Sequence, residues 1–258
     1  MFSRRSGGSR GGPAGQIAAL LAALCLVLPS SASSQEPPPL NWGRNAFQLW
    51  SGGDYSERHW SAWAGLAYSP FSAISNPGFR LRVIAGGGQF HYTGYAIEGG
   101  KIVETTLKGT SDFVEGAIGY QWQLGSWTMK LYGGALFSET RPDAFDVLPK
   151  STSRVQPKIT FENWINLSPY YWVNVDGSYA TTDRDYWSRA RLGWRVHRVL
   201  SAGPEISAEG NRYIDAWRAG IFVRYDGTWG EAVLSGGVAE EETHSPAAYL
   251  SLNWLGRF

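Results

Sequence analysis

The chain has 258 residues, and its 23 Lys and Arg against 22 Asp and Glu give a formal net charge of +1. This balance argues against a nucleic-acid partner, which would require a basic excess. With 13 Trp and 32 Gly, the composition suits a β-barrel with aromatic girdles and a polar interior. No segment after the N-terminal region approaches 18 apolar residues, which excludes a transmembrane helix there.

The first 34 residues have the order of a cleaved secretory signal peptide. Three arginines precede an unbroken apolar run over 17–28, which is too short to span a membrane. Pro29 and small residues over 30–34 follow, so we expect cleavage after Ala32 or Ser34. Cleavage removes three arginines and no acidic residue, which leaves 20 basic and 22 acidic side chains.

The mature chain is expected to consist of a spacer and one domain. Cys25 lies inside the apolar run, so the mature chain would have no disulfide, thiolate metal site or cysteine nucleophile. Residues 35–44 contain three consecutive prolines and are predicted to form an extended periplasmic spacer. Residues 45–258 are predicted to form the barrel itself.

From residue 45 onward, apolar and polar side chains alternate in short segments that turn signals separate. The segments are 45–51, 60–68, 79–92, 114–122, 127–137, 159–167, 171–179, 186–196, 200–208, 217–225, 232–238 and 247–258. The pattern predicts an all-β fold, a single closed antiparallel outer-membrane barrel of about twelve strands. Ten strands is the alternative, if the first segment and one other fail to form strands.

The connections are predicted to alternate between short periplasmic turns and long external loops. Gly52-Gly53-Asp54 is expected to close the first segment, and 94–109 and 139–157 to form long outer loops. Short turns are predicted at 124–126, 168–169, 197–198 and 226–227.

The last segment alternates most clearly and ends on an aromatic residue. We expect Phe258, Trp254 and Leu252 to face lipid, and Asn253 and Ser251 to face the interior. A terminal strand of this kind would close against the first strand, with its end in the aromatic girdle. It also resembles the signal by which outer-membrane barrels are recognised for insertion, so the barrel-assembly machinery is an expected partner.

Charged residues occupy the polar faces of the middle and late segments and would point into the lumen. The candidate binding residues are Arg189, Arg191, Arg195, Glu205, Arg218 and Arg224. Further charges on these faces are Arg80, Arg82, Lys130 and Glu209, with Glu115 opposite. Since both signs are present, we expect structural pairing inside a packed barrel. The functional alternative is a polar groove for a saccharide or an anion.

No catalytic site, metal site or cofactor is predicted. His59, His91, His197 and His244 have no metal-ligand spacing. Ser56 lies near His59 and Ser201 near His197, which leaves an outer-membrane lipid hydrolase as an open alternative.

Four aromatic side chains could stack on sugar rings, although packing in a girdle or loop is the simpler interpretation. They are Tyr92, Tyr95, Phe145 and Trp187.

A series of short motifs resembles the BcsS family, described as cellulose-biosynthesis proteins of alphaproteobacteria. The motifs are Gly119-Tyr120-Gln121-Trp122, Tyr132-Gly133-Gly134, Arg141-Pro142-Asp143, Tyr186 with Arg189-Ala190-Arg191-Leu192-Gly193, Gly203-Pro204-Glu205, Tyr213 with Arg218-Ala219-Gly220, and Ser235-Gly236-Gly237. The resemblance covers roughly Trp50 to Phe258, and the first strand matches poorly.

The resemblance implies a secreted protein of a bacterial cellulose synthesis locus without established catalytic residues. Together with the barrel pattern, it predicts a non-enzymatic accessory barrel in the outer membrane of a Gram-negative bacterium. Outer-membrane lipid, a glucan chain and periplasmic cellulose-export components are the expected partners. A narrow porin-like channel remains the alternative to an accessory role.

Overall fold

The computed structural model describes residues 45–146, 151–212, 215–241 and 246–258. The predicted signal peptide (1–34) and spacer (35–44) lie outside the described residues. No helix in the described part of the chain is long and apolar enough to cross a membrane.

The described residues form twelve strands. They are β1 (Phe47–Ser56), β2 (His59–Tyr68), β3 (Gly78–Glu98), β4 (Lys101–Leu124), β5 (Trp127–Arg141), β6 (Thr152–Asn166), β7 (Tyr171–Ala180), β8 (Asp185–His197), β9 (Leu200–Gly210), β10 (Asp215–Gly227), β11 (Gly230–Glu241) and β12 (Ala247–Arg257).

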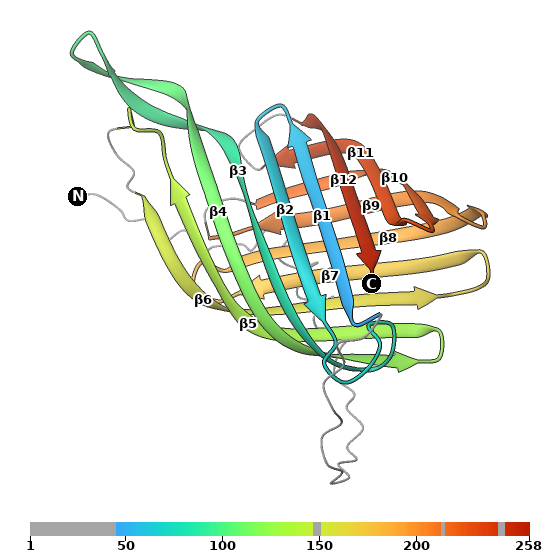
Figure 1. Cartoon of the computed structure of the whole chain (residues 1–258). Coiled ribbons are helices and arrows are strands. Elements are labelled where there is room, and N and C mark those ends of the chain that lie inside the picture. The colour runs from blue at the N-terminus through green and yellow to red at the C-terminus, as the bar shows by residue number, and fades with distance from the viewer. Residues whose placement is uncertain (1–44, 147–150, 213–214, 242–245) are drawn as a thin grey trace, which may run out of the picture.

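Each strand pairs with the next one along the chain, and β12 pairs with β1 to close the barrel. Figure 1 shows β1 (blue) lying beside β12 (dark red). At the end of this seam, Phe47 and Phe258 exchange two backbone hydrogen bonds of 2.9 Å. Because closure leaves no free strand edge, the strands satisfy one another's backbone groups all around the barrel. The predicted closed antiparallel barrel of about twelve strands is confirmed.

Side chains alternate between an apolar outer face and a polar inner face, as the last strand illustrates. Leu250 and Leu252 are 52% and 58% exposed, whereas Tyr249 and Ser251 are only 6% and 7% exposed. The same inversion of the usual burial pattern recurs on the other strands, where exposed side chains are leucine, isoleucine, valine and aromatics. An apolar outer face around a polar interior is the arrangement of an outer-membrane barrel.

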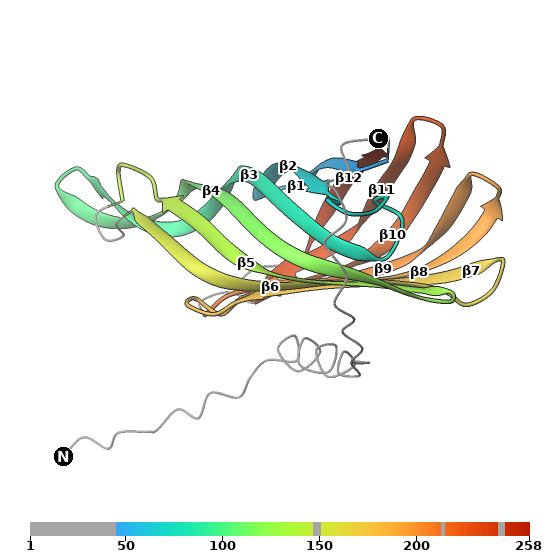
Figure 2. The same cartoon turned by 60° about the horizontal axis from the view of Figure 1, so that its bottom comes forward.

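The two ends of the barrel differ in their connections. The end where β1 begins and β12 ends, here called the turn end, carries the predicted turns at 124–126, 168–169, 197–198 and 226–227. The opposite end, here called the loop end, carries a hairpin that projects beyond the other strands (Figures 1 and 2). Pairing of β2 with β3 stops at Phe90, while β3 and β4 remain paired to Glu98 and Lys101.

The predicted loop over 94–109 is therefore wrong, because this segment continues as a paired ribbon of β3 and β4. Its β-branched residues, such as Ile102 and Val103, favour a pleated strand over a loop. Gly99 and Gly100 form the turn, with φ of 59° and 78°, in the left-handed region that glycine adopts without strain.

Two other predicted boundaries are also wrong. The predicted loop over 139–157 is shorter, because β5 continues to Arg141 and β6 begins at Thr152. β1 runs through Gly52-Gly53-Asp54 instead of ending there. Gly52 lies opposite Trp63, whose ring fills the space that a side chain would need. The glycine thus marks a packing site within the strand and not a turn.

We predict that Leu252→Arg destabilises the folded barrel by about 2–4 kcal/mol, because it places a charge on the lipid face. The matched change Thr140→Arg places the same cation on the inner face of the loop end, where Thr140 is half-buried, and should cost much less. The folded fraction can be measured as heat-modifiable gel mobility across a urea series. Equal destabilisation by the two changes would contradict the assignment of the faces.

Candidate functional site

The predicted lumen charges Arg82, Glu115 and Lys130 face the interior and form a chain of ion pairs with Lys158 and Glu162, which were not predicted. Lys158 contacts Glu115 at 2.7 Å, and Glu115 contacts Arg82 at 3.1 Å. Arg82 also contacts Glu162 at 2.7 Å, and Glu162 contacts Lys130 at 2.9 Å. Since β3 and β6 are not neighbours, the contact between Arg82 and Glu162 crosses the lumen. The side chains of Arg82 and Glu115 are 8% and 1% exposed, so each buried charge is compensated.

A second group of contacts surrounds Glu205 of β9. Arg191 donates from Nε to Glu205 Oε2, and the Ser235 hydroxyl donates to the same oxygen at 3.2 Å. The Tyr249 hydroxyl of β12 donates to Glu205 Oε1 at 3.2 Å. The Arg191 guanidinium also stacks on Phe222, 5.3 Å from the ring centroid. The carboxylate of Glu205 therefore has both a counter-ion and hydroxyl donors in a buried position.

The remaining candidates on β8 and β10 have separate partners. Arg189 contacts Asp176 of β7 at 3.0 Å. Arg218 contacts Glu209 at 2.6 Å and, across the lumen, Asp54 of β1 at 3.1 Å.

Arg224 and Arg195 lie at the turn end. Arg224 contacts Glu231 at 2.7 Å and Asp226 at 3.0 Å. Arg195 donates to the backbone carbonyls of Ser168 and Pro169 at 3.2 and 3.1 Å, and so fixes the turn between β6 and β7. The six predicted residues share the lumen but belong to different contact groups, and only Arg191 and Glu205 pair with each other.

An aromatic layer joins β6, β7 and β10 inside the lumen near the turn end, and sequence reasoning missed it. Trp172 of β7 stacks on Trp164 with a centroid distance of 4.1 Å and reaches Phe222 of β10 at 5.4 Å. Arg224 lies over both tryptophans, 4.6 and 5.4 Å from their centroids. Trp172 and Phe222 are each 1% exposed. Their inward register positions are the signal that could have placed these rings in the lumen.

Burial of the inner face changes from one end of the barrel to the other. Most large inward side chains toward the turn end are buried, as in Arg82, Tyr132, Trp172, Arg191 and Phe222. Toward the loop end Leu107, Leu136 and Gln156 are buried, but other inward side chains are half-buried, as in Ser61, Trp63, Phe90, Phe113 and Trp187. The described interior is thus packed toward the turn end and partly accessible toward the loop end.

The four aromatic residues considered for sugar stacking have different surroundings. Tyr92 lies on the projecting ribbon, where its hydroxyl accepts a hydrogen bond of 3.1 Å from the Asp143 backbone. Burial raises the pKa of Tyr92, and the nearby Asp146 raises it further. Tyr95 and Phe145 are 40% and 77% exposed. Trp187 faces the lumen, with the Arg189 guanidinium 5.1 Å from its ring centroid.

The serine hydroxyls of the two serine and histidine pairs contact a backbone carbonyl and an indole. The Ser56 hydroxyl donates to the backbone carbonyl of His59 at 3.4 Å. The Ser201 hydroxyl accepts a hydrogen bond of 3.4 Å from the Trp172 indole, inside the lumen, whereas His197 is exposed. Among the described residues, no three potential ligands of the His, Cys, Asp or Glu types gather to hold a metal ion. His244 lies outside the described residues.

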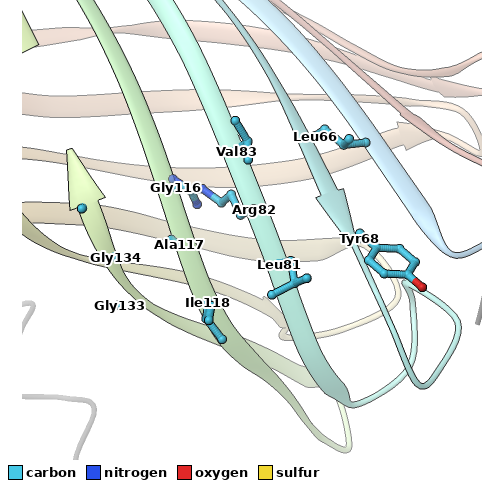
Figure 3. Close-up of a pocket in the computed structure, with 11 residues that line it drawn as sticks. Leu66, Tyr68, Leu81, Arg82, Val83, Gly116, Ala117, Ile118, Gly133 and Gly134 are labelled. Atoms are coloured by element: carbon cyan, nitrogen blue, oxygen red, sulfur yellow. The ribbon is translucent and has the colours of Figure 1, made fainter. Parts of the chain in front are cut away.

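A groove of about 580 Å³ lies on the outer face and not in the lumen (Figure 3). The groove is surrounded by Leu66, Leu81, Val83 and Ile118. Gly116 and Gly133 also line it, and because they have no side chain, the space above them is open. Tyr68 and Arg82 also line this groove, but most of its lining is apolar and faces lipid, which suits an acyl chain.

Comparisons with solved structures find barrels of low sequence identity. A KdgM porin has a TM-score of 0.49 at 9% identity, with 82% of this chain and 99% of that chain covered. Outer membrane phospholipase A from Escherichia coli has a TM-score of 0.43 at 10% identity, with 81% and 90% covered. Omp33 from Acinetobacter baumannii has a TM-score of 0.40 at 12% identity, with 83% and 99% covered. These likenesses are too slight to carry an activity to this chain.

Comparison with protein families gives one match over most of the barrel. The family described as "Cellulose biosynthesis protein BcsS" matches residues 48–258. No curated protein sequence matches the chain significantly.

We predict that Glu205→Ala destabilises the barrel by about 3–5 kcal/mol, because it leaves the Arg191 cation buried without a carboxylate. Glu209→Ala is the matched control and should cost far less. Its carboxylate is 39% exposed, and its partner Arg218 retains Asp54. Urea unfolding monitored by tryptophan fluorescence measures both variants. A Glu205→Ala protein as stable as Glu209→Ala would contradict a structural role for this ion pair.

Proposed function

The chain belongs to the BcsS family of cellulose biosynthesis proteins, and from that premise we propose that it is a non-enzymatic barrel that assists cellulose production or export at the outer membrane. The family match over residues 48–258 carries this proposal, because it spans all but the first residue of the twelve strands. The apolar outer face supports placement in the outer membrane, reached by way of the predicted signal peptide.

The contacts of the candidate side chains support a non-enzymatic role. The inward carboxylates of Glu115, Glu162 and Glu205 each bind at least one cation, so they are not held as the paired acid and base of a glycosidase. The hydroxyls of Ser56 and Ser201 are engaged with a backbone carbonyl and an indole. The proposed partners are outer-membrane lipid, the barrel-assembly machinery, and either the glucan chain or periplasmic components of cellulose export.

We predict that deleting the gene lowers extracellular cellulose and that the wild-type chain restores it. Ser56→Ala and Ser201→Ala chains should restore cellulose to the wild-type level, because neither hydroxyl is placed to act as a nucleophile. Cellulose is measured as the glucose released by a purified cellulase from washed cells. Unchanged cellulose in the deletion strain would contradict the accessory role, and failure of either serine variant alone would favour a hydrolase.

A narrow channel is the second candidate, because water reaches charged groups inside the barrel. The side chains of Glu162 and Glu209 are 32% and 39% exposed although both face the lumen. The packed rings of Trp172 and Phe222, each 1% exposed, nevertheless fill part of the lumen toward the turn end. An accessory role with a closed lumen is therefore favoured over free conduction.

Conductance across a planar bilayer tests this choice. We predict that the wild-type barrel conducts little and that the double variant Trp172→Ala, Phe222→Ala conducts more, because the two rings fill the lumen. Heat-modifiable gel mobility must first show that the variant is folded. A wild-type conductance equal to that of the double variant would contradict a lumen closed by these rings and favour the channel.

A further inference from the structure

Two aromatic rings lie along the inner wall of β2 and β4 because their opposite partners are glycines. Trp63 is opposite Gly52, and a Cβ on Gly52 would lie 2.7 Å from Trp63 Cζ2. Phe113 is opposite Gly86, and a Cβ on Gly86 would lie 2.8 Å from Phe113 Cε1. Each ring therefore occupies the space of a missing side chain on the neighbouring strand. A ring held in this way lies against the wall, which leaves its other side toward the lumen.

Phe90 of β3 repeats this arrangement closer to the loop end. It is opposite Gly109, and a Cβ on Gly109 would lie 2.5 to 3.0 Å from three atoms of the Phe90 ring. Trp63, Phe90 and Phe113 are all half-buried, so part of each ring is accessible. The three neighbouring strands β2, β3 and β4 thus carry three flat apolar surfaces.

Aromatic rings also lie over glycines nearer the turn end, where they pack in the interior. Tyr132 lies over Gly119 and Trp172 lies over Gly193, but these rings are only 3% and 1% exposed. Arginine side chains cover them: Arg82 lies 4.9 Å from the Tyr132 centroid, and Arg224 also covers Trp172. Trp50 over Gly65 is half-buried, but Arg82 also lies 5.9 Å from its ring, so arginine approaches each of these rings.

The spacing of the accessible rings suits a chain of sugar rings. Trp63 and Phe113 both lie opposite Gly86, so they share one row with a single strand between them. Adjacent strands are about 4.8 Å apart, which separates these two positions by roughly 10 Å. A disaccharide unit of an extended glucan has a comparable length. The apolar faces of its pyranose rings can stack on aromatic rings, as apolar surfaces of complementary shape do.

The row beyond Trp63 and Phe113 offers hydrogen-bonding groups for sugar hydroxyls. Ser61, Gly88 and Ser111 are consecutive cross-strand partners on the inner face. Because the side chains in this row are small or absent, the row leaves space between the Phe90 ring and the rings of Trp63 and Phe113. Hydroxyl groups of serine can both donate and accept, which matches the hydroxyl edge of a sugar.

The charges that border this wall are compensated. Asp54 contacts Arg218 at 3.1 Å, and Glu115 contacts both Arg82 and Lys158. A wall bordered by paired charges favours a neutral saccharide, whereas an anionic one would require an unpaired cation.

We propose that Trp63, Phe90 and Phe113 form a stacking platform for a neutral β-linked glucan on the inner wall of β2, β3 and β4. This inference rests on the proposed role in cellulose production and adds where the glucan binds and which side chains hold it. The platform lies toward the partly accessible loop end, whereas the aromatic layer of Trp172 and Phe222 lies toward the turn end.

Cellohexaose binding to the purified, detergent-solubilised barrel tests the platform by isothermal titration calorimetry. Trp63→Ala and Phe113→Ala should each weaken binding by about five- to tenfold, the loss expected for one aromatic contact. Phe113→Tyr should bind within about twofold of wild type, because it keeps the ring. Trp60→Ala is the matched control. Trp60 lies on β2, as Trp63 does, but on its outer face, where it is 48% exposed. Removal of its ring should leave cellohexaose binding unchanged.

Heat-modifiable mobility confirms that each variant is folded before titration. Wild-type protein that fails to bind cellohexaose, or that binds an acidic oligosaccharide in its place, would overturn the platform. Equal affinity in the wild-type, Trp63→Ala and Phe113→Ala barrels would also overturn it. The cellulose content of the deletion strain is an independent readout: lowered cellulose without cellohexaose binding would reject the platform and leave the accessory role standing.

Discussion

Pairing of β1 with β12 is the constraint on which the rest of this structure depends. Once Phe47 and Phe258 join the ends of the sheet, no strand has an unpaired edge, and a lipid environment becomes compatible with the backbone. Closure also divides every strand into an outer and an inner face. The exposed leucines and the buried arginines are both consequences of that division.

Burial of many cations in one lumen imposes the second requirement, which is charge compensation. Contacts such as Arg82 with Glu162 and Arg218 with Asp54 join strands that are not neighbours. Each contact joins two strands that are separated by two others, and the aromatic layer of Trp172 and Phe222 does the same without charge. Most of the candidate binding residues therefore have a structural task, which directs attention to the accessible loop end.

Glycine has two distinct uses in this chain. Gly99 and Gly100 turn the projecting ribbon with positive φ. Gly52 and Gly86, by contrast, remain within strands and provide space for a neighbouring ring. The second use, an aromatic side chain laid across a glycine on the adjacent strand, accounts for part of the Gly and Trp content. At the loop end this device leaves ring faces accessible, and this is the basis of the proposed glucan platform.

The sequence by itself determined the strand faces, because alternation with a period of two is local, and it predicted about twelve strands with ten as the alternative. It placed Leu252 outside, Ser251 inside, and Glu205 on the same side as Arg191. It misplaced the ribbon over 94–109, since glycines there suggested a loop that cross-strand pairing overrides. Only the tertiary structure decided which inward residues meet, because closure brings together strands distant in the sequence. The partnership of Glu205 with Tyr249, and the separation of Arg195 from the other candidates, are set by that closure and by strand register.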